Sequence, residues 1–278
     1  GPDLMDRMKE QAKRFGTTYI ADDVSSIEAC ESDSVKPTYR VTLSDDSQLE
    51  ASSLIIATGS SFRKLGVPGE QELSGHGVSY CATCDGFFFR NKPIVVVGGG
   101  DSAFEEALFL TRFGSSVTLI HRRDSFRASQ IMVDRAKANP TITLMTNTVV
   151  TSITGTSSPT QNTGAPIAIP GLTLKRPAVA PASVSSIAVR NVVTGEESTL
   201  DTNAVFVAIG HTPATDFAAG VVDRDDDGYV VVQGASTVTS APGIFAAGDC
   251  VDRTYRQAIS AAGMGCRAAL DTQAYLTD

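Results

Sequence analysis

The sequence predicts an α/β protein of about two domains, built around parallel sheets that are buried on both faces. Three observations support this fold class. The chain has 278 residues, enough for two domains and a large core. Short continuous apolar runs at residues 54–57, 93–97 and 204–209 are typical of buried strands. The second run leads through a helical pattern at 102–113 to a strand at 117–121, which makes a βαβ unit of about 30 residues.

The N-terminal part predicts one helix and then strands. Apolar residues recur at helical spacing over residues 3–15, and Gly16 ends the pattern. We expect strands at 17–28, 38–43 and 48–57, with a hairpin turn at 44–47 between the last two. The Gly-, Pro- and Ser-rich stretch 59–77 is expected to link two domains.

The rest of the chain continues the α/β pattern. A helix is expected at 129–138 and a second linker near 210–213, and a helix at 257–275 closes the chain. Further strands are predicted at 141–154, 184–193, 229–232 and 244–246. Residues 155–183 are rich in Thr, Ser, Pro, Gly and Ala, which favours a surface hairpin or loop over a partner-binding tail.

Composition excludes some functions. The net charge of −8 and the pI of about 4.9 argue against binding to nucleic acid or to a membrane surface. No apolar run reaches the roughly 18–20 residues that span a bilayer. Five cysteines with one close pair do not form a secreted disulfide framework, so we expect a reducing, cytoplasm-like compartment.

The motif Cys81-Ala82-Thr83-Cys84-Asp85-Gly86 predicts a redox dithiol. A Cys-x-x-Cys pair brings two sulfurs within disulfide reach and lowers the pKa of one thiol, and Asp85 could carry protons during exchange. A structural disulfide, half of a zinc site or a chance pair are the alternatives. Structural zinc needs four ligands, and the other cysteines and the histidines stand alone in the sequence, so no metal is expected.

A glycine-rich fingerprint follows the strand at 93–97 and precedes a helix. Its Gly-x-Gly-x-x-Ala pattern would let a pyrophosphate approach the backbone N–H groups at the helix N-terminus. The cofactor-binding residues predicted here are Gly98, Gly100, Ser102 and Ala103.

The residues after the next strand indicate which dinucleotide binds. An NAD site would place Asp or Glu there, whereas this chain has His121, Arg122 and Arg123, and then Arg127. Guanidinium groups pair bidentately with phosphate, so the cluster predicts the 2′-phosphate of NADPH. A solvated basic turn is the alternative.

A Gly-Asp pair closes the apolar strand at 244–246. At the carboxyl end of a strand, Asp249 could accept hydrogen bonds from a polyol such as the ribityl chain of a flavin. Arg256, Gln257 and Ala258 then lie at the N-terminus of the last helix, whose positive end could stabilise a reduced flavin. Taken alone, this pattern is more typical of a helix cap.

Together these motifs resemble the low-molecular-weight thioredoxin reductases. The matching segments begin at Cys81, Gly98, His121, Ala208, Ala247 and Tyr255, and they run in family order from end to end. The resemblance implies a homodimeric flavoprotein that transfers electrons from NADPH through FAD and the Cys81/Cys84 dithiol to the disulfide of thioredoxin. It also implies two Rossmann-like three-layer nucleotide-binding domains. The FAD domain is discontinuous (1–62 and 212–278), and the NADPH domain (63–211) carries the dithiol.

Residue roles follow from the same resemblance. Asp249 would meet the FAD ribityl chain, with Arg256, Gln257 and Ala258 along the flavin and Val24 and Thr58 at further FAD-lining positions. Cys84 would lie nearer the flavin, and Asp85 would donate the proton, while the cysteine that attacks thioredoxin stays open. The dithiol must serve both a flavin and a protein partner, so the linkers near 59–66 and 209–216 predict a domain rotation.

The sequence departs from the family at its beginning. The family opens with a βαβ unit that holds its own glycine fingerprint for FAD, and roughly 50 residues of this kind are absent. We therefore expect the sequence to cover part of a longer protein, not an intact enzyme, with residues 54–57 left without a neighbouring strand. The alternatives are a flavoprotein reductase of a peroxiredoxin system and a truncated, non-catalytic NADPH-binding remnant. A targeting segment could lie upstream, so an organellar location stays open.

Overall fold

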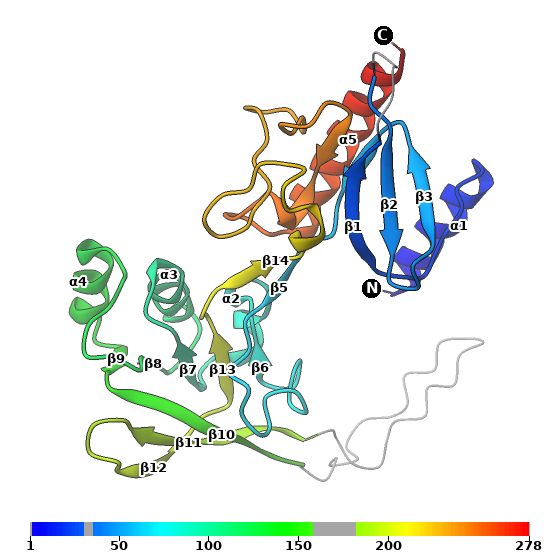
Figure 1. Ribbon diagram of the computed structural model, residues 1–278. Helices are drawn as coiled ribbons and strands as arrows, with labels where there is room; N and C mark the ends of the chain where they lie inside the picture. Colours follow the sequence, from blue (N-terminus) through cyan, green and yellow to red (C-terminus); the bar gives the residue numbers. More distant parts are fainter. Residues whose placement is uncertain (1, 31–35, 158–181, 278) are drawn as a thin grey trace, which may run out of the picture. The chain divides into compact units, whose positions relative to one another are not determined.

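The computed structural model describes residues 2–30, 36–157 and 182–277 (Figure 1). The chain divides into two compact units. One is formed by Gly1–Ser61 with Thr212–Asp278, and the other by Phe62–His211. The first unit thus takes residues from both ends of the chain. The two connecting segments form short strands, β5 (Ser60–Phe62) and β14 (His211–Pro213), that pair with each other.

The middle unit contains a five-stranded parallel sheet with the order β6-β13-β7-β8-β9. Its helices are α2 (Ala82–Asp85), α3 (Asp101–Leu110) and α4 (Gln130–Ala138). The strands are β6 (Val78–Ser79), β13 (Ala204–Val207), β7 (Pro93–Val97), β8 (Ser116–Ile120) and β9 (Ile142–Met145). The predicted βαβ unit is confirmed as β7, α3 and β8, with β7 and β8 paired in parallel from Pro93 and Ser116 onward.

The alternation of side chains along β7 explains why this sheet has two cores. Ile94 and Val96 pack with Phe104 and Leu110 on the helix side. Val95 and Val97 point the other way and pack with Ile187 and its neighbours. Because both faces are buried, the strand sequence is continuously apolar. Figure 1 shows α3 and α4 on one side of the parallel sheet and the strands β10–β12 on the other.

The second face is covered by a three-stranded antiparallel sheet, β10-β11-β12. Its strands are β10 (Thr148–Thr156), β11 (Ser183–Asn191) and β12 (Glu197–Asp201). The sequence did not predict β12, because its residues are polar and mostly exposed and carry no apolar alternation. Most of the segment expected as a surface hairpin at 155–183 lies outside the described residues.

The other unit holds an antiparallel sheet with the order β1-β2-β3. Its strands are β1 (Val24–Ala29), β2 (Tyr39–Leu43) and β3 (Gln48–Ala51). The predicted hairpin is confirmed, since Thr42 pairs with Gln48 across the turn. The first strand begins at Val24 and not at residue 17 as predicted, because residues 17–23 are irregular. Just before the strand, the Asp23 carbonyl accepts a hydrogen bond from the Ser44 N–H.

Strands β4 (Leu54–Ile56) and β15 (Ile244–Ala246) form a parallel pair in this unit. The expectation that residues 54–57 would lack a neighbouring strand is therefore wrong, because β15 provides one. Helix α5 (Ala258–Thr277) contacts both strands, and α1 (Pro2–Arg14) begins the chain. The two 3-10 turns of the unit are Asp216–Ala218 and Gly248–Cys250.

The strand predicted at 229–232 is wrong. The Val230 N–H donates to the Cys250 carbonyl, whereas the next N–H, that of Val231, donates to Asp223. Successive residues thus bond to different segments, so no continuous ladder forms in spite of the apolar sequence. No helix in the described part of the chain is both long and apolar enough to cross a membrane.

Candidate active site

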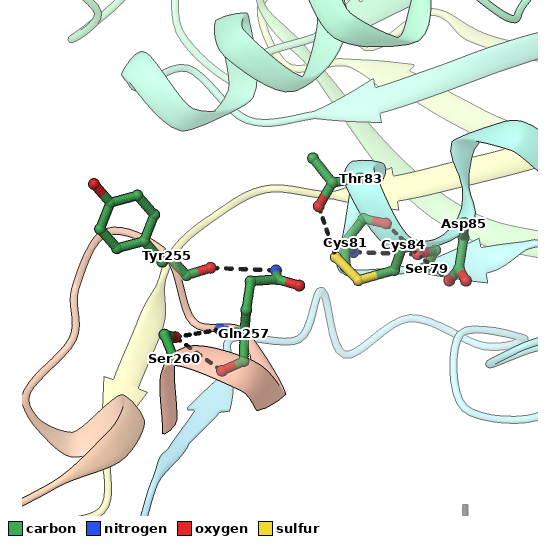
Figure 2. The surroundings of a disulfide bond; sticks show 8 residues. All are labelled: Ser79, Cys81, Thr83, Cys84, Asp85, Tyr255, Gln257 and Ser260. Carbon is green, nitrogen blue, oxygen red and sulfur yellow. Dashed lines mark hydrogen bonds between the residues drawn. A yellow bond between two sulfur atoms is a disulfide. The ribbon is translucent and has the colours of Figure 1, made fainter. Parts of the chain in front are cut away.

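The dithiol lies directly after strand β6 and contains the first residues of α2. Cys81 and Cys84 form a disulfide with an S–S distance of 2.04 Å and a Cα–Cα distance of 5.3 Å (Figure 2). One helical turn brings residues i and i+3 together, and the Cys84 N–H donates to the Cys81 carbonyl at 3.2 Å. Cys81 is half-buried and Cys84 is exposed, so the pair is open to solvent on one side.

Asp85 is held beside the disulfide by Ser79. The Ser79 hydroxyl donates to the Asp85 carboxylate at 2.7 Å and accepts the Cys81 N–H at 3.2 Å. Asp85 is therefore fixed one residue from Cys84, where a carboxyl group can carry protons during thiol exchange. The sequence reading missed Ser79, because its role depends on a turn that the sequence pattern does not define.

Close packing fixes the dithiol segment against α3. Ala82 is buried, and a Cβ added to Gly86 would lie 2.8 Å from Leu110 Cδ2 and 3.3 Å from Phe113 Cδ2. Only glycine fits this contact without displacing Leu110 at the end of α3 and Phe113 just after it. The dithiol follows β6 and the glycine loop follows β7, and both strands run parallel to β13 in the same sheet, so both features lie at the carboxyl ends of its strands.

A cavity of about 560 Å³ opens at the carboxyl ends of the parallel strands of the middle unit. This edge is where ligands bind in open α/β sheets. Its glycine-loop lining consists of Gly98, Gly99, Gly100 and Ser102. The fourth predicted fingerprint residue, Ala103, does not line the cavity and is fully buried.

The glycines of the loop differ in what they allow. A Cβ at Gly98 would lie 2.3 Å from the Ala208 carbonyl oxygen and 2.6 Å from the Ala103 Cβ. The backbone at Gly98 is therefore packed too closely against its neighbours to leave room for a side chain. A Cβ at Gly100 would meet nothing within 4 Å, so its bare backbone faces open space. Gly100 also precedes α3, where the free N–H groups of a helix start can bind phosphate.

The basic cluster lies on the same cavity. Arg122, Arg123 and Arg127 line it together with His121, and the Arg127 N–H donates to the Gly99 carbonyl at 2.8 Å. Burial lowers the pKa of His121, a hydrogen bond of the imidazole to the Ser125 backbone opposes this, and the three arginines lower the pKa further. Its Nε2 is buried without a hydrogen-bond partner among the described residues. The lowered pKa favours the neutral imidazole, and the arginines carry the positive charge of the cavity.

Two cations of the cavity were missed. Arg63 and Lys64 line it from the segment that follows β5. The sequence placed them in a linker, and only the tertiary fold brings that linker to the nucleotide edge. The donor set of the cavity includes the three arginines that follow β8 and an open glycine backbone, and it fits a dinucleotide with a 2′-phosphate.

The predicted flavin residues are in the other unit. Asp249 belongs to the turn Gly248–Cys250, which begins with Gly248 at φ +81°. Burial raises the pKa of Asp249, the neighbouring Asp252 carboxylate raises it further, and Arg256 opposes both. A half-buried carboxyl at a strand end can accept hydrogen bonds from a polyol, so Asp249 fits the ribityl chain in chemistry.

The start of α5 brings the remaining residues of this group together. Asp252 accepts hydrogen bonds from the backbone N–H groups of Thr254, Tyr255 and Arg256. Gln257 is fixed by Ser260, whose hydroxyl accepts the Gln257 N–H at 3.3 Å and donates to its carbonyl at 2.9 Å (Figure 2). Ala258 is the first residue of the 20-residue helix, whose N-terminus favours negative charge.

Val24 and Thr58 have different surroundings. The Thr58 hydroxyl donates to the Ala214 carbonyl at 2.5 Å, and its backbone contacts the Cys250 thiol next to Asp249. Val24 instead packs against the hydrophobic cluster of Ile27 and Val41. The geometry therefore places Thr58 near the Gly248–Cys250 turn, and the FAD-lining position of Val24 stays a prediction. Metal-ligand side chains form no group of three or more within the described ranges.

Comparison with known proteins gives consistent matches. Residues 7–265 match the family model for pyridine nucleotide-disulphide oxidoreductases. The chain is 50% identical over its full length to a thioredoxin reductase of Mycolicibacterium smegmatis, of which it covers 79%. It is 49% identical to a bifunctional thioredoxin reductase/thioredoxin of Mycobacterium leprae, covering all of this chain and 54% of that protein. A solved thioredoxin reductase of Streptococcus pyogenes superposes with a TM-score of 0.83 at 36% identity, over 100% of this chain and 80% of that one.

Proposed function

The chain belongs to the thioredoxin reductases of the pyridine nucleotide-disulphide oxidoreductase family, and on this premise we propose how its own residues carry the reaction. It is an oxidoreductase that uses FAD and NADPH, and its substrate is the disulfide of thioredoxin. The observation that carries the assignment of residues is the Cys81–Cys84 disulfide, which is held beside Asp85 in the same unit as the dinucleotide cavity.

The dithiol transfers its electrons by thiol exchange. In the reduced pair, one thiolate attacks the thioredoxin disulfide and forms a mixed disulfide, and one thioredoxin thiolate leaves. The second cysteine of the pair then attacks the mixed disulfide. Thioredoxin departs with two thiols, and the Cys81–Cys84 disulfide forms again. Two electrons have moved, and the two protons come from the reduced pair and solvent, with Asp85 placed to carry one.

The cavity residues bind and orient NADPH. Arg122, Arg123 and Arg127 would hold the 2′-phosphate, and the open backbone at Gly100 would admit the pyrophosphate. Asp249, Thr58, Arg256, Gln257 and Ala258 would hold FAD. When bound, the two cofactors supply the hydride and the two-electron relay that reduces the disulfide.

Two finer properties are also part of the proposal. We infer a homodimer, as the family resemblance implies, and size-exclusion chromatography with light scattering tests it against a monomer. We infer a cytoplasmic location from the single close cysteine pair. Cell fractionation tests the location, and recovery in an organelle or in the extracellular medium would contradict it.

The assay that tests the function follows NADPH oxidation with oxidised thioredoxin and, separately, with an oxidised peroxiredoxin-type substrate. We expect turnover with thioredoxin, and loss of that turnover in Cys84→Ser. Cys266→Ser is the matched control, because Cys266 is an exposed free cysteine on α5 and should retain full activity. Faster turnover with the peroxiredoxin, or normal thioredoxin reduction by Cys84→Ser, would contradict the assignment.

A further inference from the structure

Glu70 is a buried carboxylate that accepts hydrogen bonds from two backbone N–H groups and from one tyrosine hydroxyl. Its side chain is only 2% exposed. It accepts the Leu65 N–H at 2.9 Å, the Gly66 N–H at 2.8 Å and the Tyr80 hydroxyl at 3.0 Å. Burying a charge is unfavourable unless it is hydrogen-bonded, so these three donors make the arrangement possible and fix all three partners to one point.

The segment that Glu70 holds forms one wall of the dinucleotide cavity. Arg63, Lys64 and Leu65 line the cavity, and both cations are exposed. The Arg63 N–H donates to the Gly210 carbonyl at 3.0 Å, so the segment is bonded at one end to the strand end after β13 and at the other end to Glu70. A short stretch that is fixed at both ends presents its two cations in a defined place.

The same carboxylate reaches the residue before the dithiol. Tyr80 immediately precedes Cys81, and its ring stacks on Phe62 with a centroid distance of 5.0 Å. Burial, and then the hydrogen bond to Glu70, raises the pKa of Tyr80 to about 12, so the hydroxyl remains a donor at neutral pH. The buried Glu70 carboxylate therefore bonds both to the segment that lines the cavity and to the residue that precedes Cys81.

Sheet order decides which half of a dinucleotide meets this wall. The arginines follow β8 and Gly210 follows β13, and these strands lie on opposite sides of β7 with its glycine loop. A dinucleotide that places its 2′-phosphate at the β8 side crosses the glycine loop with its pyrophosphate. Its nicotinamide half would then lie on the β13 side, beside Arg63.

We propose that Glu70 is a positioning residue for NADPH: it holds Arg63 and Lys64 against the nicotinamide half of the cofactor. The proposal rests on the assignment of NADPH to this cavity. It differs from a purely structural role for Glu70 in one measurable respect. Losing the wall should weaken binding of the whole dinucleotide and spare a fragment that ends before the wall.

The test measures dissociation constants by calorimetry for two probes, NADP⁺ and adenosine 2′,5′-bisphosphate, which has the 2′-phosphate but no nicotinamide half. For Glu70→Gln we expect a roughly tenfold weaker affinity for NADP⁺, the scale of a lost hydrogen bond to a charged group, and a change of about twofold or less for the bisphosphate. Glu72→Gln is the matched control, since Glu72 is an exposed carboxylate two residues away. It should leave both constants unchanged.

If Glu70→Gln folds poorly, the variant Arg63→Ala tests the same proposal. Arg63 is exposed, so Arg63→Ala should fold normally and show the same selective loss for NADP⁺. Unchanged NADP⁺ affinity in Arg63→Ala, or equal weakening of both probes in Glu70→Gln, would overturn the proposal. If the unaltered protein binds the bisphosphate no better than 5′-AMP, the assignment of NADPH to the cavity fails first. Those two failures are distinguishable.

Discussion

The glycine loop allows one perturbation to separate a packing role from a binding role. Gly98→Ala adds a Cβ 2.3 Å from the Ala208 carbonyl oxygen and 2.6 Å from the Ala103 Cβ. Both distances are well below van der Waals contact; one neighbour is a backbone carbonyl, and the other is the Cβ of the fully buried Ala103. Gly100→Ala adds the same methyl group two residues later at φ −100°, where nothing lies within 4 Å.

The expected magnitudes follow from these distances. Overpacking of a well-packed core costs about 1–3 kcal/mol, and a clash with backbone belongs at the upper end, near 3 kcal/mol. For a unit of this size that corresponds to a fall in the melting temperature of about 6–12 °C. Gly100→Ala should change the melting temperature by about 2 °C or less. It should nevertheless weaken NADP⁺ binding at least about tenfold, because a methyl group keeps the pyrophosphate from the backbone.

Circular dichroism melting and calorimetric titration with NADP⁺ measure the two effects on the same samples. The chain has no tryptophan, so the far-ultraviolet signal is the suitable probe of unfolding. A Gly98→Ala protein that melts with the unaltered protein would refute the packing argument. A Gly100→Ala protein that binds NADP⁺ normally would refute the assignment of the pyrophosphate to this loop.

Three further predictions concern the proton carrier, the cofactor choice and the Asp252 turn that precedes α5. Asp85→Asn should slow thioredoxin reduction by about 10²–10⁴-fold while the disulfide still forms, and a normal rate in stopped-flow assays would exclude Asp85 as the proton carrier. Replacing Arg122 and Arg123 by Ala should raise the KM for NADPH roughly 100-fold with little effect on the KM for NADH, and equal changes would contradict a 2′-phosphate site. Burial raises the pKa of Asp252, but hydrogen bonds from Tyr255 and its neighbours outweigh this, so the folded-state value is lowered. The stability that Asp252 contributes is therefore present at neutral pH and lost as the pH falls below about 4. Melting curves from pH 7 to pH 3 should show this loss in the unaltered protein and a smaller one in Asp252→Ala.

The sequence was most informative where local pattern and tertiary structure agree. The apolar runs of β7 and β13 were found because strands buried on both faces carry continuous hydrophobic sequence. The glycine loop was found because its residue types are dictated by packing, as the contacts of Gly98 show. The disulfide followed from cysteine spacing alone. The roles assigned to Asp249, Arg256 and Ala258 stay predictions.

Errors occurred where distant segments decide the structure. Residues 229–232 have a strand-like sequence, but their N–H groups bond to two different segments. Strand β12 is polar and is defined by its pairing with β11. Glu70, Ser79 and Arg63 could not be singled out from composition or spacing. Their importance comes from contacts that only the folded chain creates, such as the three donors that converge on Glu70.

The central claim is that the Cys81–Cys84 pair carries electrons from NADPH to thioredoxin, and thiol trapping tests it most directly. The protein is mixed anaerobically with NADPH and alkylated with N-ethylmaleimide, and the peptide that contains both cysteines is weighed by mass spectrometry. We predict two added alkyl groups with NADPH, none without it, and none when oxidised thioredoxin is added in excess over NADPH before alkylation. Thioredoxin reduction while this peptide stays unlabelled, or persistent labelling after oxidised thioredoxin is added, would contradict the claim.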